Sequence, residues 1–327
     1  TVFNEMVPRA LEEYTKEAYA KANERNRNWG NSVLPRVNEV EGMLEAFADP
    51  AFQRVLRKAQ QSAAVTDEKA DYDLLTELLV CHVQKGDNRK NRAGILKATE
   101  VVDLIDNNAL CALTIMNIVE FAIPTLGDVM LGMYVLSDVY SKLEYTDLPE
   151  GIDWMEHLEL LGAIRLSRNI KLNKFEDFYA RALNGYACVG IRKESDNYKT
   201  AIELLKSIQI GERGLRDNIL LDGYVRLDVP NKDYIERMIL TDKNGIHKIR
   251  PDEKDVFIRI WYMYEKDDEL QKKVNKNFMD MWDSFEPLEK IHKWWNSIPM
   301  SYDITQVGKI LAHTNAKRCD PSLPDLL

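Results

Sequence analysis

Residues 301–312, Ser-Tyr-Asp-Ile-Thr-Gln-Val-Gly-Lys-Ile-Leu-Ala, constrain the fold most strongly, because they predict a short strand that passes directly into a helix. Tyr302 and Ile304 alternate with polar neighbours, as in a half-buried strand, and Thr305 is a favourable N-cap residue. The segment 163–167 alternates in the same way and is the strand partner that we expect, about 135 residues upstream. Such a pair requires residues 170–300 to form an insertion between the two strands.

Helical periodicity dominates the rest of the chain. The expected helices are 3–22, 34–48, 52–59, 67–84, 95–105, 109–123, 126–143, 149–162, 175–183, 197–208, 233–240, 252–264 and 268–295, the last with a bend at Pro287. The segments 95–105 and 109–123 carry broad apolar faces, so we expect them to pack on more than one side. The segment 126–143 is another apolar helix, and we expect the three together to form the core of a bundle.

Further strands are expected over residues 219–229 and in a hairpin over 241–249, with Lys243-Asn244-Gly245 at its turn. The sequence therefore predicts a mainly α fold, a multi-helix bundle with a few short strands. We expect a helical bundle over residues 1–145 and a helical domain with short strands over 146–327, which would contain the pair formed by 163–167 and 301–312.

Composition indicates an ordinary intracellular globular protein of 327 residues. Acidic residues outnumber basic ones 53 to 44, a formal net charge of −9, so binding to nucleic acid would need a local basic face. The four cysteines lie far apart, as expected for reduced thiols in the cytoplasm. The apolar stretch 109–123 is too short to cross a bilayer, so we expect no membrane association.

Motifs for metal or cofactor chemistry are absent from the sequence. His157-Leu-Glu159 matches part of a zinc deaminase signature but lacks the Pro-Cys-x-x-Cys partner. The five histidines form no HExxH, and the chain contains no GxSxG, no GxxxxGK[ST] and no GxGxxG. We therefore expect no metal and no cofactor, and the sequence favours a non-enzymatic protein.

Basic residues cluster in two places, between Lys85 and Lys97 and after the strand at 163–167. If the two segments share one face, they form a phosphate-contacting surface; otherwise the first is an ordinary charged loop. The candidate nucleic-acid contacts are Arg89, Lys90, Arg92, Arg165, Arg168, Lys171 and Lys174. A further basic group, Arg54, Arg57 and Lys58, precedes them.

Residues 158–166, a helix end followed by glycine and a strand, resemble the point where a winged-helix recognition helix enters its wing. The segment 301–312 is similar to the closing strand and helix of such a module. Together with 64–79 and 100–105, the ending 294–318 resembles an uncharacterised bacterial family of helical proteins known by locus names, over residues 50–320. The resemblance implies a cytoplasmic protein with a split winged-helix-like element, loosely associated with defence or accessory genes, and assigns no catalytic residues.

Three function classes fit these observations. The first is a non-enzymatic interaction or regulatory protein, accessory to a defence system, that binds a protein partner or its own second copy. The alternatives are a nucleic-acid-binding regulator that uses the basic wing, and a divergent enzyme or defence effector without a recognisable motif. Partner identity and oligomeric state are not encoded in any motif of the sequence.

Overall fold

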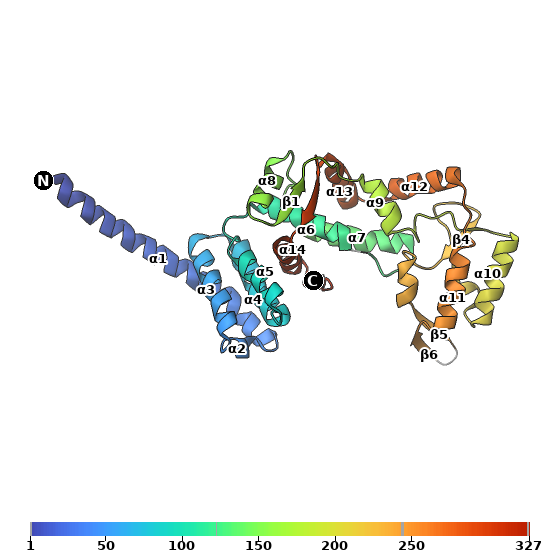
Figure 1. The fold of residues 1–327 in the computed structure, drawn as a ribbon, viewed down its shortest axis with the longest axis horizontal. Coiled ribbons are helices and arrows are strands. Elements are labelled where there is room, and N and C mark those ends of the chain that lie inside the picture. Colours follow the sequence, from blue (N-terminus) through green and yellow to red (C-terminus); the bar gives the residue numbers. More distant parts are fainter. Residues whose placement is uncertain (1, 122, 243–244, 326) are drawn as a thin grey trace. The chain divides into compact units, whose positions relative to one another are not determined.

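The computed structural model describes residues 2–121, 123–242, 245–325 and 327 (Figure 1). Within these ranges the chain forms fourteen α-helices and seven short strands, so the mainly α prediction is confirmed. Two compact units are present. The first contains residues 1–120, 142–170 and 299–327, and the second contains residues 121–141 and 171–298.

The first unit is mostly helical. Its elements are α1 (Val2–Glu39), α2 (Met43–Ala46), α3 (Pro50–Val65), α4 (Lys69–Lys85), α5 (Arg89–Thr99), α6 (Asn107–Phe121), α8 (Asp153–Leu160), β1 (Ile164–Ser167), β7 (Ser301–Ile304) and α14 (Gln306–Cys319). Helices α3, α4 and α5 pack against one another, α1 packs on α3 and α4, and α14 packs on α4 and α5. Buried side chains such as Phe52, Leu75 and Ile95 fill the space between them.

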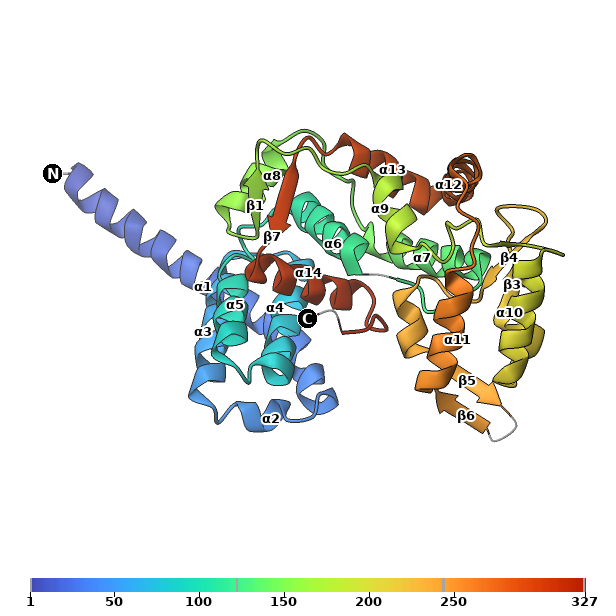
Figure 2. The same ribbon diagram turned by 45° about the vertical axis from the view of Figure 1, so that its right-hand side comes forward.

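Strands β1 and β7 pair antiparallel, with Ile164 opposite Ile304 and Ser167 opposite Ser301 (Figure 2). The predicted long-range strand pair is therefore confirmed, and residues 171–298, which lie between the two strands in sequence, belong to the second unit. The Thr305 hydroxyl accepts a hydrogen bond from the Gly308 amide at 3.1 Å and donates to the Gly162 carbonyl at 2.6 Å. One N-cap residue thus starts α14 and ties it to the end of α8.

The second unit combines helices with two small antiparallel sheets. Its elements are α7 (Val129–Leu143), α9 (Phe175–Ala182), β2 (Ile191–Arg192), α10 (Asp196–Ser207), the 3₁₀ turn η1 (Gly211–Gly214), β3 (Leu215–Asp217), β4 (Tyr224–Leu227), the 3₁₀ turn η2 (Asp233–Arg237), β5 (Ile239–Asp242), β6 (Gly245–Lys248), α11 (Pro251–Trp261), α12 (Asp268–Trp282) and α13 (Glu286–Ser297). The strands are ordered β2-β4-β3 in one sheet, and β5 pairs with β6 in the other.

Several boundaries differ from the sequence prediction. One continuous helix, α1, covers the expected helix 3–22, the polar run after it and the start of the expected helix 34–48, and the remainder of 34–48 contains only the short helix α2. The expected helix 268–295 is two helices. Pro287 lies in the first turn of α13, where backbone N–H groups have no partner within the helix, so the N–H that proline lacks is not missed. The expected strand 219–229 is reduced to β4, and 233–240 is a 3₁₀ turn that leads into β5. The strands of the predicted hairpin are present, whereas Lys243 and Asn244 of its turn lie outside the described residues.

None of the helices, over the residues that the structure describes, combines the length and the apolar content that spanning a bilayer requires.

Gly308 provides a direct test of the contact between α14 and β1. A Cβ atom at this position would lie 2.0 Å from the Ala163 carbonyl oxygen, a distance far shorter than real Cβ contacts. We expect Gly308→Ala to lower the free energy of unfolding by about 1–3 kcal/mol. The measurement is calorimetric unfolding of the full chain.

Gly30 of α1 is the matched control, because a Cβ atom there meets no heavy atom within 4 Å. Gly30→Ala should be neutral or stabilise the helix by about 0.5–1 kcal/mol, since alanine loses less backbone entropy. Unchanged or raised stability of Gly308→Ala would contradict the tight contact.

Candidate functional site

The structure places five of the seven predicted phosphate contacts in the first unit and two in the second. In the first unit, Arg89, Lys90 and Arg165 are exposed, and Arg92 is half-buried. Arg168 is exposed but its guanidinium group is paired with a carboxylate oxygen of α8, Glu159, at 2.7 Å. The remaining two, Lys171 and Lys174, are exposed in the second unit.

The upstream basic group lies beside α5. Arg54 and Arg57 are exposed on α3, and α3 packs on α5. A hollow of about 490 Å³ brings Lys58 and Lys97 next to the end of α8 at Leu160. The ammonium groups of Lys58 and Lys97 lie 3.6 and 3.4 Å from carboxylate oxygens of Glu100, so Glu100 partly neutralises the positive charge of this hollow. The hollow therefore joins a moderately basic surface to an exposed apolar side chain.

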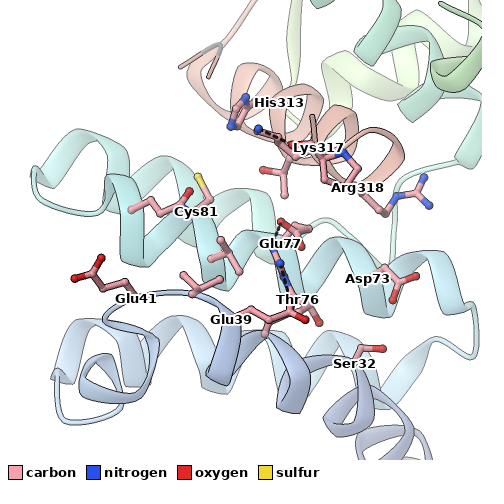
Figure 3. A pocket seen from close by; sticks show the side chains of 16 residues that line it. Ser32, Glu39, Glu41, Asp73, Thr76, Glu77, Cys81, His313, Lys317 and Arg318 are labelled. Carbon is pink, nitrogen blue, oxygen red and sulfur yellow. Dashed lines mark hydrogen bonds and ion pairs between the residues drawn. The ribbon is translucent and has the colours of Figure 1, made fainter. Parts of the chain in front are cut away.

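A second cavity, of about 800 Å³, lies between α1, α4 and α14 (Figure 3). Its lining combines charges of both signs with a buried thiol. The lining residues are Ser32, Arg36, Glu39, Val40, Glu41, Asp73, Thr76, Glu77, Val80, Cys81, Gln84, His313, Thr314, Lys317, Arg318 and Pro321. They come from both ends of the chain, so no local motif could have revealed this site.

Arg36 of α1 crosses to α4 at this cavity. Its guanidinium group lies 2.9 Å from Glu77 and 3.0 Å from Glu39, so one cation serves two carboxylates. Burial raises the pKa of Glu77 above its ordinary value, and the opposing effect of Arg36 is smaller. These three side chains therefore form a closed charge cluster at the α1 side of the cavity.

Arg318 of α14 is held rigidly by a buried polar network. Its Nε donates to Asn315 at 2.9 Å, and its guanidinium carbon lies 4.8 Å from the centre of the Tyr145 ring. Asn315 is fully buried and donates in turn to Thr114 at 2.8 Å. Such fixed arginines are well suited to bind carboxylate or phosphate groups, because little side-chain entropy remains to be lost.

Cys81 and His313 lie at the same cavity but in a buried environment. Burial raises the pKa of Cys81 to about 12, so its thiol is protonated at neutral pH and is not an activated nucleophile. Burial also lowers the pKa of His313, whose Nε2 lies 3.8 Å from Asp325. Over the described part of the chain, no group of three or more His, Cys, Asp or Glu side chains is placed to hold a metal ion.

His313 gives a pH test of this buried environment. Its folded-state pKa is below the ordinary value of 6.5, so below that pH the unfolded chain takes up a proton that the folded chain resists. We expect wild-type stability to fall, relative to His313→Gln, by up to about 1.4 kcal/mol per pH unit as the pH drops below 6.5. Denaturant unfolding at about pH 8, 6 and 5 measures the difference. A constant difference across this range would show that His313 is not buried as described.

Comparisons with known proteins identify one family. A family model, whose description is only a "-like" label that states no activity, matches residues 1–324. No curated protein and no solved structure matches the chain. The match covers more of the chain than the resemblance over residues 50–320. It includes both chain segments, 32–84 and 313–321, whose residues line the 800 Å³ cavity. The chain thus belongs, over almost its whole length, to this uncharacterised "-like" family.

Proposed function

We propose that this is a non-enzymatic interaction protein that associates with a second copy of itself through the outer face of α7. The observation that carries the proposal is an apolar stripe on that helix. Met130, Leu131, Tyr134 and Val135 are 40%, 52%, 58% and 43% exposed. A stripe of this kind on a surface marks an interaction site more often than a single exposed residue does.

Helix α7 is apolar on both of its faces. The inner face, with Val129, Met133 and Leu136, is buried in the structure. The outer face is equally apolar in sequence, which is why the segment 126–143 was expected to lie in a core. The structure covers that face only in part, where the Phe285 ring packs edge-on against Tyr134 with 5.1 Å between ring centres, although a helix that is apolar on both faces normally packs on two sides. A second surface is therefore needed to cover the rest of this face.

Charge favours a second copy as that surface. The protein carries a net charge of −9, so most faces of two copies repel one another. Between Asp128 and Asp138, by contrast, α7 contains no charged residue. A two-fold axis would place this neutral stripe against itself without bringing like charges together. Exposed Leu126, just before the helix, extends the apolar surface.

The family resemblance suggests a wider setting for this assembly face. A regulatory or accessory role in the bacterial cytoplasm, as in a defence system, agrees with a protein whose described surface offers such a face. In this view α8, β1, β7 and α14 together form a split winged-helix-like element. Helix α8 presents Asp153, Glu156 and Glu159, so its outer side fits a protein partner better than a phosphate backbone.

Leu131→Glu combined with Val135→Glu tests the α7 interface. Both changes place charges on the stripe and leave the buried face intact. We expect the wild-type protein to dimerise and the variant to bind its second copy at least about 100-fold more weakly, because burying each of the two apolar side chains contributes about 1.5–3 kcal/mol. Sedimentation equilibrium measures both.

Leu44→Glu is the control, since Leu44 is 66% exposed on α2 and belongs to the first unit, whereas the stripe belongs to the second. It should dimerise like the wild type. A wild-type protein that is monomeric at every concentration up to about 200 µM, a range that covers ordinary interfaces, would rule out self-association through α7.

A second candidate function is nucleic-acid binding, favoured by the basic surface of α3 and α5 next to the start of the wing. Arg54→Glu combined with Lys90→Glu should reduce retention on duplex DNA at low salt, and the salt slope should fall by about one for each lysine or arginine that binds a phosphate. Arg165→Glu tests the wing itself. Arg213→Glu, on the exposed η1 turn, is the control. Absence of binding to duplex and single strands at low salt would exclude this function.

A further inference from the structure

We propose that the cavity between α1, α4 and α14 binds a short peptide-like zwitterion, a molecule with a free carboxylate and a free ammonium group. The starting observation is that the lining of the cavity includes charged side chains of both signs that, within the described ranges, form no ion pair with one another. Lys317 and Arg318 belong to α14, Asp73 belongs to α4, and Glu41 follows α1 at the other end of the view from Asp73 (Figure 3). A ligand with one charge of each sign can pair with both kinds of side chain.

The two cations form no ion pair with a carboxylate among the described residues. Lys317 donates to the backbone carbonyls of Pro321, at 3.1 Å, and Leu323. Arg318 donates to the neutral amide of Asn315. In the same ranges, Glu41 and Asp73 form no ion pair, whereas their neighbour Glu77 is already paired with Arg36. The charges without an ion pair are thus two of each sign: both cations come from α14, and the two carboxylates come from α4 and from the turn after α1.

Unsatisfied polar atoms lie around the same cavity. Three buried nitrogen atoms of its lining have no hydrogen-bond partner among the described residues: Arg36 Nε, Arg318 Nη2 and His313 Nδ1. His313 is only 7% exposed, so bulk water does not compensate for the missing partner. Buried polar groups of native proteins are nearly always hydrogen-bonded, to protein, to ordered water or to a bound molecule, so a ligand that enters this cavity can supply the missing partners. Two of the three nitrogen atoms are donors, which suits a carboxylate.

The geometry assigns each end of the ligand. Arg318 is fixed by Asn315 and Tyr145, so its guanidinium group is preorganised to receive the carboxylate, with Lys317 adding charge. Asp73 and Glu41 are left to bind the ammonium group. A cavity of about 800 Å³ is within the range of small-molecule sites and is large for a single amino acid, which favours a ligand of two or three residues.

The experiment compares probes that differ in one property at a time. Glycine, diglycine and triglycine vary the distance between the two charges, and N-acetyl and C-amide forms of triglycine each remove one charge. We expect diglycine or triglycine to raise the melting temperature of the full-length protein by a few degrees at saturation. Both capped forms should bind at least about 10-fold more weakly, as measured by titration calorimetry.

Two variants assign the contacts. The Asp73→Asn variant should bind free and N-acetylated triglycine with equal affinity. The Arg318→Gln variant should bind free and C-amidated triglycine with equal affinity. Arg57→Gln and Glu150→Gln, exposed and outside the cavity, are the controls and should bind like the wild type. If Arg318→Gln does not fold, Asp73→Asn still decides, because Asp73 forms no ion pair in the described fold.

The proposal is overturned if no glycine peptide binds, if a capped form binds as tightly as the free peptide, or if Asp73→Asn binds both forms as the wild type does. Sedimentation of the cavity variants separates this result from self-association through α7. The cavity variants should still dimerise, and Leu131→Glu with Val135→Glu should still bind the peptide.

Discussion

The antiparallel pair of β1 and β7 is the constraint on which the first unit depends. It joins segments separated by the residues of the second unit and fixes where α14 begins. Thr305 caps α14 while bonding to the end of α8, and Gly308 allows the helix to approach the Ala163 carbonyl. With its start fixed in this way, α14 lies on α4 and α5 and supplies one wall of the 800 Å³ cavity.

Burial of polar groups then gives α14 its chemical character. Asn315 is fully buried and its hydrogen bonds to Thr114 and Arg318 are satisfied, so the network orients an arginine that would otherwise sample many rotamers. The same burial keeps the Cys81 thiol protonated and disfavours the charged form of His313. The cavity is thereby suited to recognition by fixed charges, and its thiol is not activated for nucleophilic attack.

Different surfaces of the chain carry different physical properties. The α7 stripe is apolar and uncharged, the α3 and α5 surface is moderately basic, and α8 is acidic. This segregation explains why an overall charge of −9 does not describe how any one face would meet a partner. The family match extends over residues 1–324, so all three surfaces lie within the matched region.

Local patterns in the sequence determined the helical class and the cap at Thr305, because periodicity and caps act within a few residues. They also indicated that the segment 126–143 is an apolar helix. The pairing of Ile164 with Ile304 was expected from the resemblance to a winged-helix ending and not from periodicity. Only the tertiary structure decided that one face of α7 stays largely exposed, that Lys171 and Lys174 lie in the second unit, and that Asp73 and Arg318 line the same cavity. These outcomes depend on contacts between residues far apart in the chain, and hydrophobic periodicity carries no information about which distant surfaces meet.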